Sequence, residues 1–235
     1  IINKEKFYSD KPVEFLGLHQ ILYVFDSDME HQQTHVHFYD GNTKIGSAVY
    51  EGIYDGVGSL SLGGPLVMDI PKGATDADMP EAYRGTMLEM RLWNKALSEG
   101  EIQQYAKRRL TGYEVGLLDN FALNEGKGTL CYNKAVGGSD LQLYSATWNL
   151  PAGLSLKLDG EKGVVLNDSA FVRTNSQDYT LMFWFRTSQS SGTLLANGPA
   201  QDEPQWKNHF NIGLDEGKVY YRNGNFEVKS TNEMA

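Results

Sequence analysis

Cysteine is almost missing from this chain, since Cys131 is the single one among 235 residues. One cysteine cannot form an internal disulfide, so a domain held together by a disulfide framework is excluded. We expect Cys131 to be a small buried side chain, because no residues of a nucleophilic site surround it. No apolar run approaches the ~20 residues that a membrane-spanning helix needs, which predicts no membrane insertion.

Positive charge is also scarce. The 30 aspartates and glutamates outnumber 21 lysines and arginines, which gives a formal net charge of -9. This acidic balance argues against nucleic acid, and against an anionic membrane surface, as the main partner. The sequence begins at Ile1 rather than at a methionine, and we interpret the chain as an internal or mature part of a longer protein.

What the chain does contain is a large apolar fraction. Hydrophobic residues make up 40% and charged residues 22% of it, so it can bury a sizeable core and is not disordered. Short β-rich runs alternate with turn signals, a pattern typical of an all-β sandwich or barrel. The predicted strands cover 20–25, 34–39, 59–64, 117–123, 141–143, 154–158, 163–166, 179–186, 193–195, 210–214 and 218–222.

The most informative stretch begins at residue 85. Residues 85–97 predict a strand that ends abruptly in a short helix over 98–111. Ser98 and Glu101 have the spacing of a capping box at the start of that helix. Gly112 stands where a C-cap glycine is expected, so the pattern predicts both ends of the helix.

This stretch resembles the closing strand and terminal helix of the laminin G-like, concanavalin A-like jelly-roll domains. In that family a strand with an arginine and a tryptophan, here Arg91 and Trp93, ends in an Asn-x-Ala-Leu-Ser turn, here 94–98. The resemblance implies a two-sheet antiparallel jelly-roll sandwich and a domain that binds ligands more often than it catalyses. It extends over nearly the whole chain through the segments 19–25, 36–41, 110–117, 121–128, 156–160, 180–187 and 192–198.

The order of these motifs is unusual. Residues 1–112 resemble the later strands and closing helix of one such domain, and residues 113–235 resemble the earlier strands of a laminin G-like domain. The chain is then either cut from a tandem array of repeats or folded as one permuted sandwich. A half-sandwich would expose an apolar face and open strand edges. We therefore favour one sandwich assembled from both parts, within the chain or by strand exchange with neighbouring domains of the parent chain.

Three carboxylates alternate after the first strong strand, at Asp26, Asp28 and Glu30. We interpret them first as a solvated loop. Carboxylates are also ligands that calcium prefers. The resemblance implies a calcium ion at one rim of the domain, since many members of the family hold one there. Asp26, Asp28 and Glu30 are therefore our candidate metal-binding residues. Asp76 and Asp78 are a second candidate pair. The third alternative is catalysis, because laminarinase-like jelly-roll glycoside hydrolases carry such alternating acids.

Histidines gather near the same strands. His35 and His37 share one face of the predicted strand 34–39, and His19 would join them if it lies on the adjacent strand. Such a trio is a possible divalent metal site. Exposed histidines on a polar strand face are the commoner arrangement, and that is our first interpretation.

Saccharide binding needs exposed aromatic rings beside planar polar groups, and two segments have that mixture. The candidate ligand-binding residues are Asp202, Glu203, Trp206 and Asn208 in the loop 201–209, and Tyr221 and Asn223 in the segment 220–223. The alternative is that Trp206 packs under its own loop and that one tyrosine of each pair is a core residue. We assign the other three tryptophans to the core, at Trp93, Trp148 and Trp184.

Because no convincing catalytic set is present, the sequence favours a non-catalytic recognition or adhesion module, such as a lectin domain. The expected partner is a glycan or a cell-surface protein, bound by rim loops, and the expected location is extracellular, in a secreted, bacterial protein. Two alternatives are a jelly-roll glycoside hydrolase acting on a glucan, and a structural spacer or assembly module of a large surface protein or toxin. Each is an inference from fold analogy.

Overall fold

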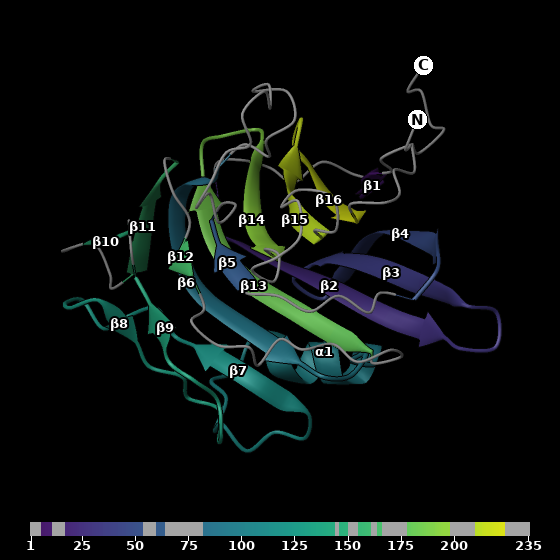
Figure 1. Ribbon diagram of the computed structural model, residues 1–235, viewed down its shortest axis with the longest axis horizontal. Helices are drawn as coiled ribbons and strands as arrows, with labels where there is room; N and C mark the ends of the chain where they lie inside the picture. Colours follow the sequence, from purple (N-terminus) through teal and green to yellow (C-terminus); the bar gives the residue numbers. More distant parts are fainter. Residues whose placement is uncertain are drawn as a thin grey trace, which may run out of the picture.

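The protein is an all-β sandwich of antiparallel strand pairs with one short helix (Figure 1). The structure is a computed structural model that describes residues 6–10, 17–53, 60–63, 82–143, 146–149, 155–160, 164–165, 178–197 and 210–223. Within these ranges no helix has the length and apolarity that crossing a bilayer requires. The all-β prediction is confirmed.

Two eight-stranded assemblies make the sandwich, and we call them the β6 sheet and the β15 sheet. The β6 sheet runs in the order β10 (Thr147–Asn149), β11 (Ser155–Asp159), β6 (Arg84–Trp93), β13 (Tyr179–Thr187), β2 (His19–Asp28), β3 (Gln33–Asp40) and β4 (Thr43–Glu51), and β7 (Leu117–Phe121) also pairs with β6. The β15 sheet runs in the order β1 (Lys6–Tyr8), β16 (Lys218–Asn223), β15 (Phe210–Asp215), β14 (Gly192–Asn197), β5 (Leu60–Leu62), β12 (Val164–Val165), β9 (Leu141–Gln142) and β8 (Leu130–Cys131).

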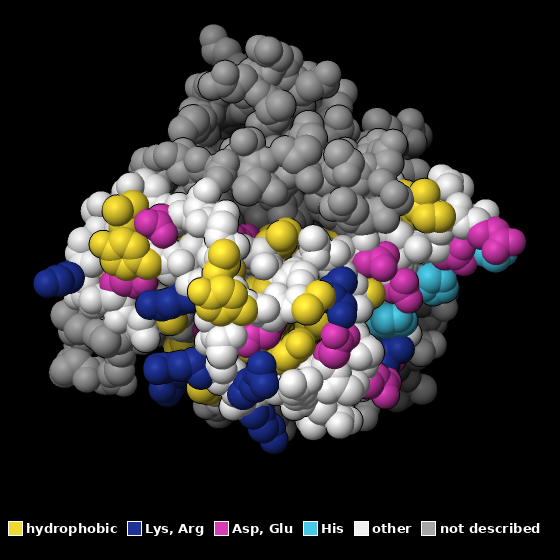
Figure 2. Space-filling view, turned by 90° about the horizontal axis from the view of Figure 1, so that it is seen from below, with side chains coloured by type: hydrophobic (Ala, Val, Ile, Leu, Met, Phe, Trp, Pro, Cys, Tyr) yellow, Lys and Arg dark blue, Asp and Glu magenta, His cyan; other side chains and the backbone are white. Residues whose placement is uncertain are grey.

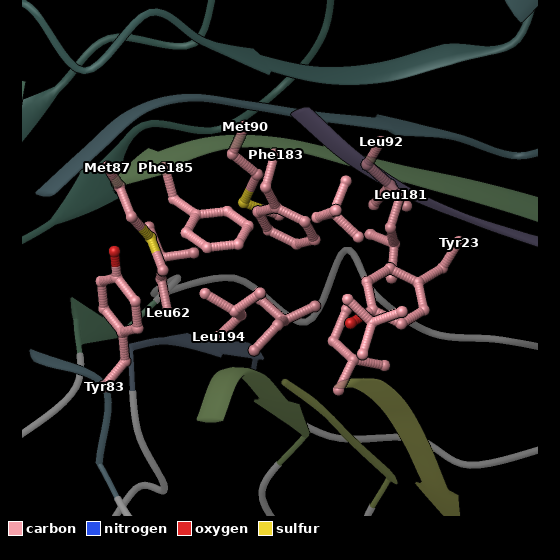
Figure 3. Close-up of a cluster of buried hydrophobic side chains, with 14 of the residues drawn as sticks. Tyr23, Leu62, Tyr83, Met87, Met90, Leu92, Leu181, Phe183, Phe185 and Leu194 are labelled. Carbon is pink, nitrogen blue, oxygen red and sulfur yellow. The ribbon is translucent and has the colours of Figure 1, made fainter. Parts of the chain in front are cut away.

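The core lies between the two sheets. Alternate residues of β13, namely Leu181, Phe183 and Phe185, are fully or almost fully buried and face Leu62 and Leu194 of the β15 sheet (Figure 3). Met182, on the opposite face of β13, is also fully buried, in the cluster under α1, so the middle of this strand is covered on both faces. Each such side chain stabilises the fold by roughly 1.5–3 kcal/mol relative to leaving it in water.

Strands from both parts of the chain lie within each sheet. In the β6 sheet, β6 pairs with β11 on one side and with β13 on the other, and β13 also pairs with β2. In the β15 sheet, β5 lies between β14 and β12. Residues before and after 112 therefore complete the sheets within one chain.

The helix α1 (Glu99–Ala106) covers part of the outer face of the β6 sheet, the face away from the β15 sheet. Ile102 and Ala106 pack there against Trp93 and Leu22. Ser98 is the N-cap and forms the predicted capping box with Glu101, so the start of the helix is confirmed. The helix is shorter than the predicted span 98–111.

The predicted C-cap is wrong, because the helix ends at Ala106 with Lys107 as its C-cap. Gly112 lies five residues further on, in a turn where it does adopt a positive φ of 91°. A side chain there would clash with the backbone carbonyl oxygen of Lys134. Gly112 therefore permits a close approach of two loops and has no part in ending the helix.

Candidate functional site

The part of the outer face that α1 leaves open carries a pocket of about 330 Å³. It lies at the start of β6, whereas Trp93, which packs under the helix, is at the end of that strand. Three cations from three adjacent strands line it. The lining residues are Arg84, Gly85, Thr86, Lys157, Leu158, Arg186, Thr187 and Ser188.

Strand register places the central residues of the pocket in one row. Thr86 of β6 is paired with Lys157 of β11 on one side and with Arg186 of β13 on the other. Paired residues in neighbouring antiparallel strands project from the same face. The row Lys157–Thr86–Arg186 therefore crosses three strands side by side.

Burial shows why these side chains point outward. Leu156 and Leu158, which flank Lys157, belong to the buried core, and so does Phe185, which precedes Arg186. Because neighbouring residues of a strand project to opposite faces, Lys157 and Arg186 must project away from the core, and both are exposed.

Hydrogen bonds from beneath fix the floor of the pocket. The hydroxyl of the fully buried Tyr83 donates to the carbonyl oxygens of Arg186 (2.8 Å) and Thr86 (3.3 Å). Burial raises the pKa of Tyr83, which keeps this hydroxyl protonated and able to donate. A Cβ on Gly85 would clash with the Tyr83 hydroxyl. Gly85 thus allows the tyrosine to lie directly under the strand.

The pocket is a local concentration of positive charge on an acidic protein. Arg84, Lys157 and Arg186 line it, and none of the residues that line it is an aspartate or glutamate. The Nε of Arg84 donates to the carbonyl oxygen of Asp159 (2.9 Å), which orients its guanidinium. A pocket of this kind favours an anion, since the electrostatic potential of several like charges adds.

An aromatic ring lies beside the cations. Trp184 is two residues before Arg186 on the same face of β13, which corresponds to about 7 Å along the strand. Its side chain is half-buried, unlike that of Trp93, which is fully buried, so Trp184 does not have the core position that the sequence predicted. Trp148 is partly buried and packs against the core as expected.

Most of the ligand-binding residues predicted from the sequence cannot be compared with this pocket. Asp202, Glu203, Trp206 and Asn208 lie outside the described residues, and Asn223 is described only by its backbone pairing with Phe210. Tyr221 is 1% exposed and packs edge-on against Phe25, with ring centroids 4.9 Å apart. Its ring is part of the core rather than of a surface patch.

The predicted carboxylates lie where β2 enters its turn to β3. Asp26 and Asp28 belong to β2, which extends further than the sequence predicted, and Glu30 lies in the exposed turn. Oδ1 of Asp28 accepts from the backbone N–H groups of Glu30 (3.0 Å) and His31 (3.1 Å), and Oδ2 pairs with the His31 ring at 2.7 Å. These bonds, led by the one from the His31 N–H, lower the pKa of Asp28. A lowered pKa is the opposite of what a general acid needs.

No metal cluster is found among the residues that the structure describes. No group of three or more histidine, cysteine, aspartate or glutamate side chains in these ranges could hold an ion. His35 and His37 do share the outer face of β3, but His19 projects to the core face of β2, as the buried Ile21 does, and pairs with Asp40 at 3.2 Å. Asp76 and Asp78 lie outside the described residues. Asp26, Asp28 and Glu30 lie within the described ranges and are not gathered into such a group, and calcium bound there is a prediction from the sequence alone.

Cys131 is a buried core residue, as expected. Burial, reinforced by the negative charges of Glu125 and Asp140, raises the pKa of its thiol to about 12. The thiol is therefore protonated and a poor nucleophile at neutral pH.

The pocket could not be predicted from the sequence, because it depends on which strands lie side by side. The patterns Leu156-Lys157-Leu158 and Phe185-Arg186-Thr187 mark two cations on outward strand faces. They do not say that β11 and β13 lie on either side of β6, which is a long-range pairing.

Comparison with known proteins gives no relative for this chain. No family model matches it, and neither a curated protein nor a solved structure matches it. The laminin G-like resemblance thus rests on the sequence motifs alone, and the function must be argued from the geometry of the pocket.

Proposed function

We propose that this chain is a non-catalytic recognition module that binds an acidic saccharide in the cationic pocket of the β6 sheet. The observation that carries the proposal is the row Lys157–Thr86–Arg186, flanked by Arg84, in a pocket without a lining carboxylate. A module of this kind belongs in a secreted or cell-surface protein, where such saccharides are displayed.

The row suits a carboxylate or sulfate group. Neighbouring strands are ~4.8 Å apart, so Lys157 and Arg186 are separated by roughly 10 Å at the backbone, and their long side chains can converge above Thr86. Arginine can bind an oxyanion through two parallel N–H donors, and lysine adds a mobile point charge. The hydroxyls of Thr86 and Ser188 offer further hydrogen bonds to a ligand.

The saccharide part of the proposal depends on Trp184. A half-buried indole beside charged and hydroxyl groups combines an apolar surface with directional polar contacts, which is the usual composition of a small-ligand site. A pyranose ring with an acidic substituent would use both. The pocket is open on a sheet face, which suits a chain-like ligand that extends beyond it.

A binding titration tests the proposal. Dextran sulfate and polygalacturonate should bind the whole chain, uncharged dextran should not, and affinity should fall as salt rises from 50 to 200 mM. The double variant Lys157→Ala/Arg186→Ala should weaken binding by about tenfold or more, because a hydrogen bond to a charged group contributes ~1.5–3 kcal/mol.

The matched control is Lys44→Ala, which removes one exposed cation from β4. It should change affinity less than about twofold, because exposed charges outside a site contribute little. Equal binding of dextran and dextran sulfate, or equal loss in the control and the double variant, would contradict the proposal. Trp184→Ala distinguishes recognition of the sugar ring from recognition of the negative charge. This variant should bind polygalacturonate more weakly, and its binding should keep the same dependence on salt.

A further inference from the structure

Among the described residues, two groups of exposed apolar side chains lie beside charges of opposite sign. One group, which we call the basic patch, consists of Tyr113, Val115 and Val136 with the exposed cations Arg109 and Lys134. Tyr113 and Val115 are each 80% exposed. The parts of this patch adjoin one another, since the N–H of Val136 donates to the carbonyl oxygen of Gly112 at 3.1 Å.

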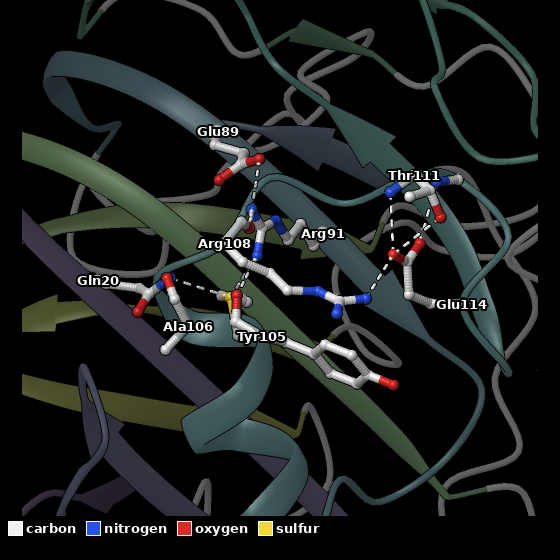
Figure 4. A network of polar contacts seen from close by, with 10 residues as sticks. Gln20, Glu89, Arg91, Tyr105, Ala106, Arg108, Thr111 and Glu114 are labelled. Carbon is white, nitrogen blue, oxygen red and sulfur yellow. Dashed lines mark hydrogen bonds and ion pairs between the residues drawn. The ribbon is translucent and has the colours of Figure 1, made fainter.

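The loop that carries Tyr113 and Val115 is rigidly held. Glu114, between them, turns inward and accepts hydrogen bonds from the N–H groups of Thr111 (2.9 Å) and Gly112 (3.0 Å), and its side chain is only 3% exposed. Arg108 closes this network at 3.1 Å (Figure 4). Because the carboxylate is fixed inside the turn, the apolar side chains on either side of it are held in solvent. Such pre-organised aromatic and apolar groups lose little entropy when they bind a partner.

The second group, which we call the acidic patch, lies where β2 and β4 end and β3 begins. It consists of the exposed side chains of Met29 (47% exposed) and Val49 (43%) with the exposed carboxylates of Asp26, Glu30 and Glu51. Strand pairing brings its parts together, because His35 pairs with Asp26 on one side and with Val49 on the other. This patch has the same apolar character as the basic patch and the opposite charge.

Both patches lie on the side of the molecule that carries α1. Figure 2 shows this side with lysine and arginine side chains mainly over its left and lower parts, and with histidine and the densest group of aspartate and glutamate side chains at the right, around the β2–β3 turn; other carboxylates lie at the left and in the centre. A face with complementary patches at its two ends is complementary to itself when a second copy faces it across a two-fold axis. The basic patch of each copy then meets the acidic patch of the other.

We propose that this face is a self-association surface, on which two copies of the chain form a closed, two-fold symmetric dimer. We propose a second copy as the occupant because this face carries both a basic and an acidic patch, so two copies can pair their opposite charges. Without such pairing, the net charge of -9 would make two copies repel each other. The dimer should be sensitive to salt, because its charged contacts lie near solvent. The proposal uses residues other than those that line the saccharide pocket, although the pocket and the two patches lie on the same side of the β6 sheet, the one that carries α1.

Sedimentation velocity over a concentration series tests the proposal with the whole chain at low salt. The chain should change from monomer to dimer and no further. Arg109→Glu/Lys134→Glu and, separately, Glu30→Lys/Glu51→Lys should each weaken self-association by at least tenfold, since like charges would then face each other. All four positions are exposed, so the variants should fold. Lys218→Glu in β16 is the control and should associate as the unchanged chain does.

The decisive measurement mixes the two double variants. Each alone should be monomeric, and their equimolar mixture should form a 1:1 dimer, because the reversed patches are again complementary. Three results would overturn the proposal: a monomer at every concentration, association that both double variants leave unchanged, or species that grow beyond a dimer. The last would show an open head-to-tail contact instead of a closed pair.

Discussion

Glu114 shows at the scale of one residue how a surface loop is given a fixed shape. Burial by itself would raise the pKa of this carboxyl, but the hydrogen bonds from Thr111 and Gly112 outweigh it and lower the pKa to about 2. The ionised form is thus favoured by folding. A carboxylate whose pKa is lower in the folded state stabilises the fold above its unfolded pKa, and this stability is lost as pH falls through the folded value.

We therefore expect Glu114→Gln to lower the free energy of unfolding by about 1–3 kcal/mol at pH 7. The difference between this variant and the unchanged chain should shrink between roughly pH 5 and pH 2, because the carboxylate is protonated across that range. Urea unfolding at several pH values measures both effects. Glu216→Gln, at an exposed turn position, is the control and should change stability by less than about 0.5 kcal/mol. A pH-independent difference would contradict the assignment.

At the scale of elements, the end of α1 is held by side chains from the sheet beneath it. Arg91 is 3% exposed and donates to the carbonyl oxygens of Tyr105 (2.7 Å) and Arg108 (2.8 Å), and Gln20 donates to that of Ala106 (2.7 Å) (Figure 4). Helix ends need such partners, because the last carbonyl groups have none within the helix. The arginine of the sequence motif thus supplies hydrogen-bond donors to carbonyl groups at the C-terminal end of α1.

Arg91 also compensates a partly buried acid. Glu89 pairs with it at 2.9 Å; burial raises the pKa of Glu89, and the Arg91 charge partly offsets this rise. We expect Arg91→Met to destabilise the chain by about 3–5 kcal/mol, because it leaves both Glu89 and the helix carbonyls without the cation. The double variant Glu89→Gln/Arg91→Met should lose less than the sum of the two single variants. Chemical unfolding of all four proteins gives this coupling, and strict additivity would show that the pair does not interact.

At the scale of the whole molecule, the interleaved strands make the two parts of the chain one structural unit. β13, from the second part, lies between β6 and β2, from the first. Neither part can keep its share of the sheet when the other unfolds. A core of this kind should therefore be lost in a single step.

We expect calorimetry of the whole chain to show one unfolding transition. Phe38→Ala in β3 and Phe183→Ala in β13 remove fully buried rings from the two parts, and each should cost about 3–5 kcal/mol. Both variants should shift the same transition to lower temperature. Two transitions, of which each variant moves only one, would show that the parts unfold separately.

Local sequence patterns determined a large part of this protein. The near-continuous apolar run within Tyr179–Thr187 and the spacing of Ser98 and Glu101 are local features of the sequence, so the all-β class, most strands and the start of α1 could be predicted. Gly112 was misjudged because a glycine with positive φ serves a helix end and a loop crossing equally well.

Only the tertiary structure decided what the sequence left open. Lys157, Thr86 and Arg186 are far apart in the chain and form one pocket because β11 and β13 flank β6. Arg91 can donate hydrogen bonds to carbonyl groups at the end of α1 because the helix packs over the strand that carries this residue. Which strands pair with one another depends on how the whole core is packed, and no local pattern in the sequence specifies it. The cationic pocket therefore could not be found from the sequence alone.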